Sequence, residues 1–400
     1  MKFPWISFHN KNLLIGIVGS ILLIAIVSLS YFLTQTQKNV TSLNAQEKKL
    51  SESLEMIKKQ VDDKEKELVA VQNEDQYKKN KALEDEIKNI HDGYEKAVSI
   101  YEELVKLKEQ TNKTEELDKR FTKALTLLSE KNYASASAEL NVLSLKIKDE
   151  QSKLVASFTI PKNVPVNNAP PGSGYRRQQV QIDIGSYLVD IFTADLNSVR
   201  VIVDTAADGD CRDNCPVLAL GDYVSRSGAI AGINGPYFCP ASYPSCAGKT
   251  NSFDTLLMNK NKVYFNSDNN VYSTVPAVIF TGNSARFVGQ SLEWGRDTGV
   301  DSVIASQPML LSGGNIVYGG DSEPKRGSKG SRSFIGTSGS TVYIGVVHNA
   351  TVAEVARVLH GLGIQYALNL DSGGSTAFWV GGYKVGPGRA TPFGILIVGK

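Results

Sequence analysis

The chain has 400 residues, a formal net charge of +2 and a hydrophobic content of 42%. This length exceeds one ordinary hydrophobic core and indicates two folded regions. Because the charge is close to balanced, composition gives no reason to expect a nucleic-acid partner.

The first expected element is a transmembrane helix over residues 13–33, an uncharged apolar run that follows a short segment, residues 1–12. At about 1.5 Å per residue, such a run can cross a hydrocarbon core of about 30 Å. A cleaved signal peptide is the alternative, since Ser28 and Ser30 form a weak small-x-small site. The run exceeds the usual signal length, so we favour a membrane anchor.

Residues 40–156 contain no proline and are dense in Lys, Glu, Gln and Leu, which predicts a helical stalk. Apolar residues follow the spacing of a coiled-coil seam at Leu43, Leu50, Leu54, Ile57, Val61, Leu68 and Val71. After a polar break at residues 73–80 the period resumes, and apolar sets within 117–128 and 134–147 predict a helical hairpin. The stalk either self-associates or binds a partner, or it is a spacer; we favour the spacer.

Residues 157–174 are rich in proline, glycine and asparagine and form the expected linker to a domain over residues 175–400. In that domain the glycine content rises and strand patterns replace helical ones. The expected fold class is therefore α+β, with a helical N-terminal part and a strand-rich mixed domain. The expected strands are 180–184, 187–192, 199–203, 229–234, 256–265 as a hairpin, 275–280, 302–305, 316–318 and 341–347. Helices are expected at 217–226 and after Thr351, which forms a capping box with Glu354.

The four cysteines, Cys211, Cys215, Cys239 and Cys246, lie close together in the sequence of this domain. Their even number favours two disulfides in an oxidising compartment, with the pairing left open. A zinc site is the alternative, although no CxxC spacing is present. Disulfides place the C-terminal domain outside the cytoplasm and residues 1–12 inside. The localisation predicted is therefore a single-pass membrane protein.

Nearby, Asp208, Asp210 and Asp213 offer carboxylates for a structural calcium ion, but their order does not match an EF-hand loop. We therefore expect no cofactor, with calcium at these residues as the alternative.

The stretch ALNLDSGGSTAFW, residues 367–379, is the strongest candidate for chemistry. A short buried strand delivers Asp371 into a turn that contains Gly373 and Gly374, whose backbone can approach an anion closely. Ser375 and Thr376 add hydroxyls to the same turn. The alternative is an ordinary tight turn.

Two further clusters precede this turn in the sequence. In GINGPYF, residues 232–238, Asn234 stands at a strand end, with Tyr237 two residues past the following glycine. In KRGSKGSRSFIG, residues 325–336, Arg332 adjoins a strand that fixes its direction, and arginine can hold phosphate with paired donors. Lys325, Arg326 and Lys329 are expected to form an exposed basic loop.

The order of these motifs, followed by Gly388-Arg389 and a last apolar strand at 393–398, resembles the phosphodiester glycosidase family over about residues 178–400. Pro236 and Ser372 stand where the family usually has glycine. The resemblance implies a hydrolase that cleaves a sugar-1-phosphodiester bond in surface glycans or anionic polymers. It implies Asp371 as the catalytic carboxylate, with Asn234 orienting the sugar. It also implies phosphate binding by Arg332, Gly373, Gly374 and Arg389, with Tyr237, Ser375 and Thr376 beside the substrate.

A partner acid, if the reaction uses one, is expected among Asp254, Glu323 and Asp301. Two other functions stay open. The domain can be a cell-surface glycan-binding or scaffolding module without turnover, or a phosphodiesterase that cleaves on the phosphorus side.

Overall fold

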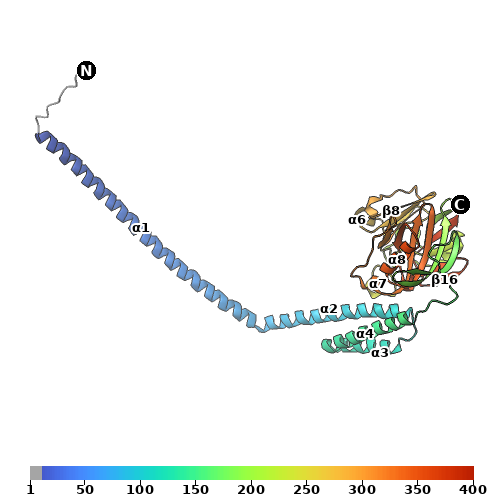
Figure 1. The fold of residues 1–400 in the computed structure, drawn as a ribbon. Coiled ribbons are helices and arrows are strands. Elements are labelled where there is room, and N and C mark those ends of the chain that lie inside the picture. The colour runs from blue at the N-terminus through green and yellow to red at the C-terminus, as the bar shows by residue number, and fades with distance from the viewer. Residues whose placement is uncertain (1–10) are drawn as a thin grey trace, which may run out of the picture. The chain divides into compact units, whose positions relative to one another are not determined.

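The computed structural model describes residues 11–400, so most of the predicted cytoplasmic segment, residues 1–12, lies outside the described residues. The chain divides into two compact units, residues 1–88 and 89–400. The first unit is mainly α1 (Lys11–Asn73), one continuous helix that contains the apolar run (Figure 1). By length and composition α1 can cross a membrane, and its apolar window is exposed throughout.

The predicted coiled-coil seam lies on α1, where the side chains of Leu43, Leu50 and Leu54 are exposed. The predicted helix is confirmed by α1. Because these side chains are exposed, the coiled coil stays a prediction. Within the predicted polar break, residues 73–80, the helix is interrupted only at Glu74, since α1 ends at Asn73 and α2 (Asp75–Lys108) begins two residues later.

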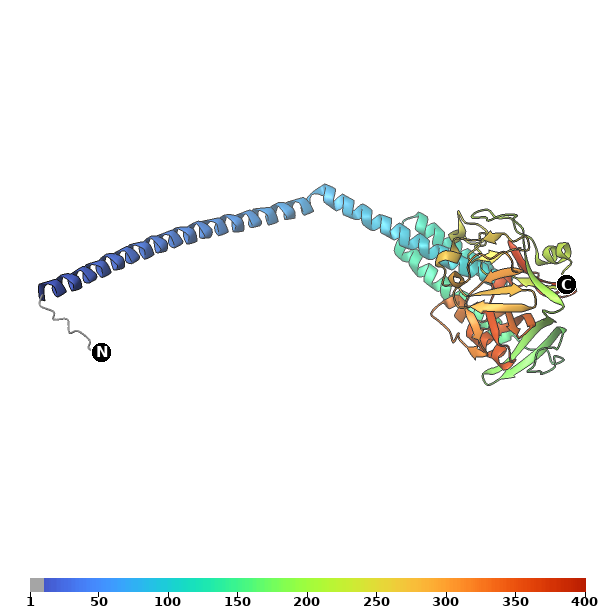
Figure 2. The ribbon, with the colours of Figure 1, turned by 90° about the horizontal axis from the view of Figure 1, so that it is seen from above.

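The predicted helical hairpin is confirmed as α3 (Glu115–Ser129) and α4 (Tyr133–Ser157). The side chain of Asn132 caps α4 by accepting a hydrogen bond from the backbone N–H of Ser135. The hairpin packs against the C-terminal part of α2, and both views show the three helices side by side (Figures 1 and 2). Their shared core consists of Ala97, Ile100, Leu104, Leu107, Leu117, Ala124, Leu128, Ala136, Leu140, Leu143 and Ile147.

The rest of the second unit contains three antiparallel sheets within the described residues. The largest has the order β1 (Gly174–Ile182), β2 (Gly185–Asp195), β13 (Thr341–Ala350), β12 (Gly330–Ser338), β14 (Tyr366–Asn369), β10 (Met309–Ser312) and β11 (Asn315–Ile316). The second has the order β16 (Tyr383–Val385), β15 (Phe378–Trp379), β4 (Ala231–Asn234), β17 (Phe393–Gly399) and β3 (Val199–Thr205). The third has the order β6 (Tyr264–Phe265), β5 (Leu257–Met258), β9 (Ser302–Ala305), β7 (Ala277–Thr281) and β8 (Ser284–Val288).

The seven-stranded sheet is the central layer of this domain. Helix α8 (Val352–Gly361) packs on one face through Val352, Val355 and Leu359, and it carries the predicted capping box of Thr351 and Glu354. The opposite face shares one core with the other two sheets, through residues such as Ile344 and Ile395. The mixed α+β class is therefore confirmed.

Short helices complete the domain: α5 (Leu220–Ser227), α6 (Asn269–Tyr272), α7 (Pro324–Gly327), and the 3-10 turns η1 (Pro244–Cys246), η2 (Ser291–Glu293) and η3 (Gly373–Ser375). The predicted disulfides are confirmed, and they pair Cys211 with Cys215 and Cys239 with Cys246. Both bridges join residues close in sequence, so each fixes the path of a surface loop.

Candidate functional site

Asp371 follows the inner strand β14, which leads directly from α8 as the sequence predicts. Its backbone N–H donates to the carbonyl of Gly235, 3.1 Å away, and its carboxylate accepts the backbone N–H of Ser372 at 2.8 Å. The turn that follows needs glycine at Gly373, whose φ of +66° lies in the left-handed region. Asp371 is therefore held by backbone contacts on both sides of the strand end.

Asn234 lies behind this turn and is almost fully buried. Its side-chain N–H donates to the Asp371 carbonyl at 2.7 Å, and its side-chain oxygen accepts from the Ser333 hydroxyl at 2.7 Å and the Ala377 N–H at 3.1 Å. Because both ends of the amide bind protein groups, the structure places Asn234 as a brace for the Asp371 turn.

Asp371 borders a cavity of about 400 Å³. Of the residues selected from the sequence, Arg332, Tyr237, Gly373, Ser375 and Arg389 line the same cavity. Gly374 and Thr376 instead line an adjoining hollow, together with Gly373 and Arg389. The structure thus gathers the candidates around one turn, with Asn234 behind it.

Tyr237 forms part of the cavity wall, and its hydroxyl accepts a hydrogen bond from the Asn369 side chain at 2.7 Å. Burial raises the pKa of this tyrosine above its ordinary value, and the nearby charge of Asp371 acts in the same direction. The hydroxyl therefore stays neutral at physiological pH.

Arg332 is 5% exposed and extends from β12 toward the cavity. Its guanidinium donates to the backbone carbonyls of Ala350, Lys325 and Ser328. Burial lowers the pKa of Arg332, while Tyr237 and Asp371 counteract the effect. A buried guanidinium whose partners are carbonyls retains its full positive charge for a ligand.

Lys325 and Lys329 are exposed, as the sequence predicts, whereas Arg326 is half-buried, and all three also line the cavity. Arg326 pairs with Asp321 at 2.7 Å, and Lys329 pairs with Glu354 at 3.1 Å. The short helix α7 carries Lys325 and Arg326, and the side chain of Glu323 caps it by accepting the Lys325 backbone N–H at 3.2 Å. The cavity is therefore more cationic than the sequence motif alone indicates.

The carboxyl end of α2 also reaches this site, which the sequence did not predict. Glu102 and Lys106 line the cavity, and Glu109 lines the adjoining hollow. Glu109 forms an ion pair with Arg389. A Cβ at Gly374 would lie 2.0 Å from the Glu109 carboxylate, so the close approach depends on glycine there.

Arg389 lines both the cavity and the adjoining hollow. Its guanidinium lies 5.4 Å from the ring centre of Tyr243, and its backbone N–H donates to the Gly374 carbonyl at 2.7 Å. Lys325 lies over the same ring at 5.3 Å. Burial raises the pKa of Glu109, against the lowering effects of Arg389, Lys106 and the Gly374 backbone N–H.

The titration of the site carboxylates differs from that of ordinary surface acids. Burial raises the pKa of Asp371 to about 6, although Ser375, the Ser372 N–H and Arg389 favour its ionised form. Burial also raises the pKa of Asp254, another residue of the cavity wall. Glu323 lines the cavity as well, whereas Asp301 accepts the Gly282 backbone N–H and lies outside the lining.

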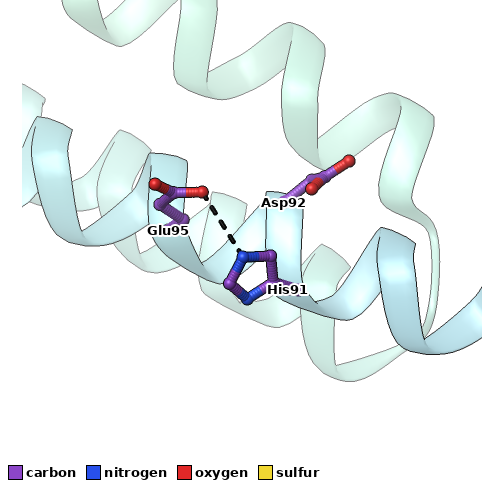
Figure 3. Close-up of side chains that lie close together, drawn as sticks. All are labelled: His91, Asp92 and Glu95. Carbon is purple, nitrogen blue, oxygen red and sulfur yellow. Dashed lines mark ion pairs between the residues drawn. The ribbon is translucent and has the colours of Figure 1, made fainter.

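The acids considered for calcium serve other partners. Asp210 accepts the Asn266 backbone N–H at 2.9 Å, and Asp213 accepts that of Thr250 at 2.7 Å. Within the described part of the chain, the group of three close ligand atoms is His91, Asp92 and Glu95, all exposed on α2 (Figure 3). Exposed acids at helical spacing are common without a metal, so this group does not define a site.

Residues 227–398 match the family model described as phosphodiester glycosidase, which confirms the resemblance inferred from the sequence for this segment. No curated protein matches the chain. A hypothetical protein from Synechocystis is 14% identical with a TM-score of 0.40, and the match covers 56% of this chain and 62% of that one. The catalytic domain of zebrafish N-acetylglucosamine-1-phosphodiester alpha-N-acetylglucosaminidase, auto-inhibited by pro-peptide, is 15% identical with a TM-score of 0.43, covering 61% and 90%.

Proposed function

We propose that the chain is a membrane-anchored hydrolase of sugar-1-phosphodiester bonds outside the cytoplasm, on the ground that residues 227–398 match the phosphodiester glycosidase family model. The observation that carries the proposal is Asp371, a half-buried acid with a raised pKa that borders a cavity walled by several cations. A carboxylate beside a cationic cavity suits a substrate that carries a phosphodiester next to its reacting sugar carbon.

The chemistry follows from the leaving group. Cleavage between the anomeric carbon and its oxygen releases a phosphate monoester, which needs little protonation because it already departs as a stable anion. The developing positive charge on the sugar is what the site must stabilise. The Asp371 carboxylate serves this step by stabilising that charge or by activating the attacking water.

Other residues support this step. Arg332 and the wall cations hold the phosphate, while Tyr237 and Ser375 lie beside the sugar. Asn234 fixes the turn that carries Asp371 and so acts as a positioning residue. Among the candidate partner acids, Asp254 and Glu323 line the cavity, which favours them over Asp301.

The location of the activity rests on α1 and the disulfides. A helix long and apolar enough to cross a membrane precedes the domain, and disulfides form in oxidising compartments. Tethering restricts the enzyme to substrates near its own membrane, such as surface glycans or anionic polymers. Self-association through the exposed seam of α1 is the alternative to a spacer, and cross-linking of the full chain in a membrane distinguishes the two.

The experiment is hydrolysis of the methyl diester of N-acetylglucosamine 1-phosphate by the full chain in detergent, beside its Asp371→Asn and Asp301→Asn variants. We expect free sugar from the wild type and from Asp301→Asn, and none from Asp371→Asn. Equal release by Asp371→Asn would contradict the assignment of the carboxylate.

The same experiment separates the other functions. Binding without release by the wild type, across several sugars, would favour a glycan-binding or scaffolding module. Sugar phosphate as the product would instead identify a phosphodiesterase.

A further inference from the structure

We propose that the glycosidase site is completed by the helical segment N-terminal to the linker, with Lys106 of α2 binding the negative charge of the substrate's phosphodiester. The inference rests on the proposed function of the domain and adds a residue from outside the family match, residues 227–398. It makes α2 part of the substrate site, whereas the sequence favoured a spacer.

The first argument is the balance of charge around the cavity. Arg326, Lys329 and Arg389 each pair with a carboxylate, namely Asp321, Glu354 and Glu109. The other three cations have different partners. Arg332 donates to backbone carbonyls, Lys325 lies over the Tyr243 ring, and the Lys106 amine lies 3.5 Å from the Ser328 hydroxyl. These three cations share the wall beside Asp371, so the cavity suits an anionic group there.

The second argument is that the position of Lys106 is fixed from both sides. Glu102, Lys106 and Glu109 are spaced four and three residues apart, so they share one face of α2. Glu102 accepts the backbone N–H of Ser245 at 3.1 Å, which ties the helix to the loop closed by the Cys239–Cys246 disulfide. Glu109 ties the next turn to Arg389 and Gly374.

Lys106 therefore reaches the site between two anchoring contacts. A Cβ at Gly373 would lie 3.7 Å from its Cε, which places the lysine stem directly over the Asp371 turn. Glu102 and Glu109 are positioning residues in this arrangement, and Lys106 is the group that faces the cavity.

The electrostatic surroundings of Lys106 agree with an anion-binding role. Burial, together with the like charges of Arg332 and Lys325, lowers the pKa of Lys106 to about 8, while Asp371 and Glu109 act in the opposite direction. A bound phosphodiester would offset the repulsion among the three cations. The amine is charged below about pH 8, so its contribution to binding is present there and is lost as the pH rises.

The test uses the full chain and the methyl diester of N-acetylglucosamine 1-phosphate. Lys106→Met keeps the length of the side chain and removes its charge, while Lys106→Arg keeps a charge that does not titrate. Lys108→Met is the matched control, because Lys108 lies two residues away and pairs with Asp118 of α3 at 2.6 Å.

We expect Lys106→Met to raise KM about tenfold or more while kcat changes less than about threefold, since a hydrogen bond to a charged group is lost. Lys106→Arg should stay within about threefold of the wild-type KM and should lose the rise of KM above about pH 8. Lys108→Met should match the wild type. An unchanged KM in Lys106→Met, or a lower one, would overturn the inference; a lower KM would mean that α2 obstructs the site.

A second measurement separates this inference from the proposed function. Calorimetry of the same diester with full-length Asp371→Asn, beside the Asp371→Asn/Lys106→Met double variant, reports binding without turnover. Tenfold weaker binding by the double variant supports the role of Lys106 even if the wild type releases no sugar. Equal binding by the two would overturn it, whatever the wild type hydrolyses.

Discussion

Asp371 and Asp190 are both enclosed carboxylates of the same domain, yet their surroundings differ in kind. Asp190, on β2, is fully buried and receives two hydrogen bonds from Arg177, at 2.8 and 2.9 Å, and others from Tyr175 and His348. Burial alone would raise its pKa, but these partners outweigh burial and hold the pKa below its usual value. Asp371 has its pKa raised to about 6, and the cations around it face a cavity.

The difference separates a structural carboxylate from one placed for chemistry. Every strong partner of Asp190 belongs to the protein, so its charge is used in holding β1, β2 and β13 together. The cavity beside Asp371 leaves room for a substrate to complete its surroundings. An acid with a raised pKa that borders a cavity is therefore the better candidate for catalysis than one whose partners all belong to the fold.

The largest expected effect concerns turnover. Asp371→Asn should lower kcat by about 10³-fold or more, because the group that meets the developing charge is lost. Asp190→Asn should keep kcat per folded molecule within about threefold. Steady-state hydrolysis, corrected for the folded fraction by circular dichroism, measures both. Similar losses of kcat in the two variants would mean that Asp371 is no more catalytic than Asp190.

The next effect concerns stability. Here we expect Asp190→Asn to be more damaging than Asp371→Asn, the opposite of their order in loss of kcat. Asp190→Asn should lower the free energy of unfolding by about 2–3 kcal/mol, below the full value for a buried pair because the Arg177 side chain is 40% exposed. Chemical denaturation of the full chain, with the transition of the strand-rich domain followed by near-ultraviolet circular dichroism, measures the change. A loss in Asp371→Asn as large as that in Asp190→Asn would mean that both acids are structural.

A smaller effect on kcat is expected from Asn234, which lies behind the Asp371 turn. Asn234→Ala should lower kcat about 10- to 100-fold with little change in KM, because Asp371 loses the amide that holds its carbonyl. Ser333→Ala, which removes one of the bonds to Asn234, is the control and should cost less than about threefold. Full kcat in Asn234→Ala would show that the turn holds its geometry without the brace.

The smallest effect is a difference in pH dependence. A pKa raised in the folded state means that the folded chain holds the proton of Asp371 between about pH 4 and 6, so ionisation weakens the fold as the pH rises through this window. Asp371→Asn should therefore be about 1–2 kcal/mol more stable than the wild type at pH 7, discounted because the side chain borders a cavity. Asp190 acts with the opposite sign, since its stabilisation is lost as the pH falls below the ordinary range of an aspartate. Urea denaturation at pH 4 and pH 7 measures both pH dependences. If the wild type becomes more stable relative to Asp371→Asn between pH 4 and pH 7, the expectation for Asp371 is contradicted.

Much of the fold follows from local patterns in the sequence. The capping box at Thr351 and Glu354 marks the start of α8, and the apolar run before Asp371 marks β14, so the central turn was predictable. The helical hairpin was predictable for the same reason, because its apolar residues repeat with helical spacing.

The remaining parts of the site depend on contacts between distant segments. Lys106 has the sequence surroundings of an ordinary exposed helix residue, and nothing in its spacing indicates its contact with Ser328, 222 residues further along the chain. Lys325 is exposed, as its loop composition indicates, but its place in the cavity wall over the ring of Tyr243 depends on a contact that the sequence does not show. The sequence predicted Asn234 as a sugar ligand because its neighbours resemble a motif, while its hydrogen bonds place it behind the turn.

The most direct measurement is the identity of the bond that the full chain cleaves. Hydrolysis of the methyl diester of N-acetylglucosamine 1-phosphate in ¹⁸O-labelled water, followed by mass spectrometry of the released methyl phosphate, distinguishes the two sides of the bridging oxygen. Attack at the sugar carbon leaves the phosphate without label, and this is the result we predict. Labelled phosphate from the wild type would show attack at phosphorus and would contradict the assignment of a glycosidase.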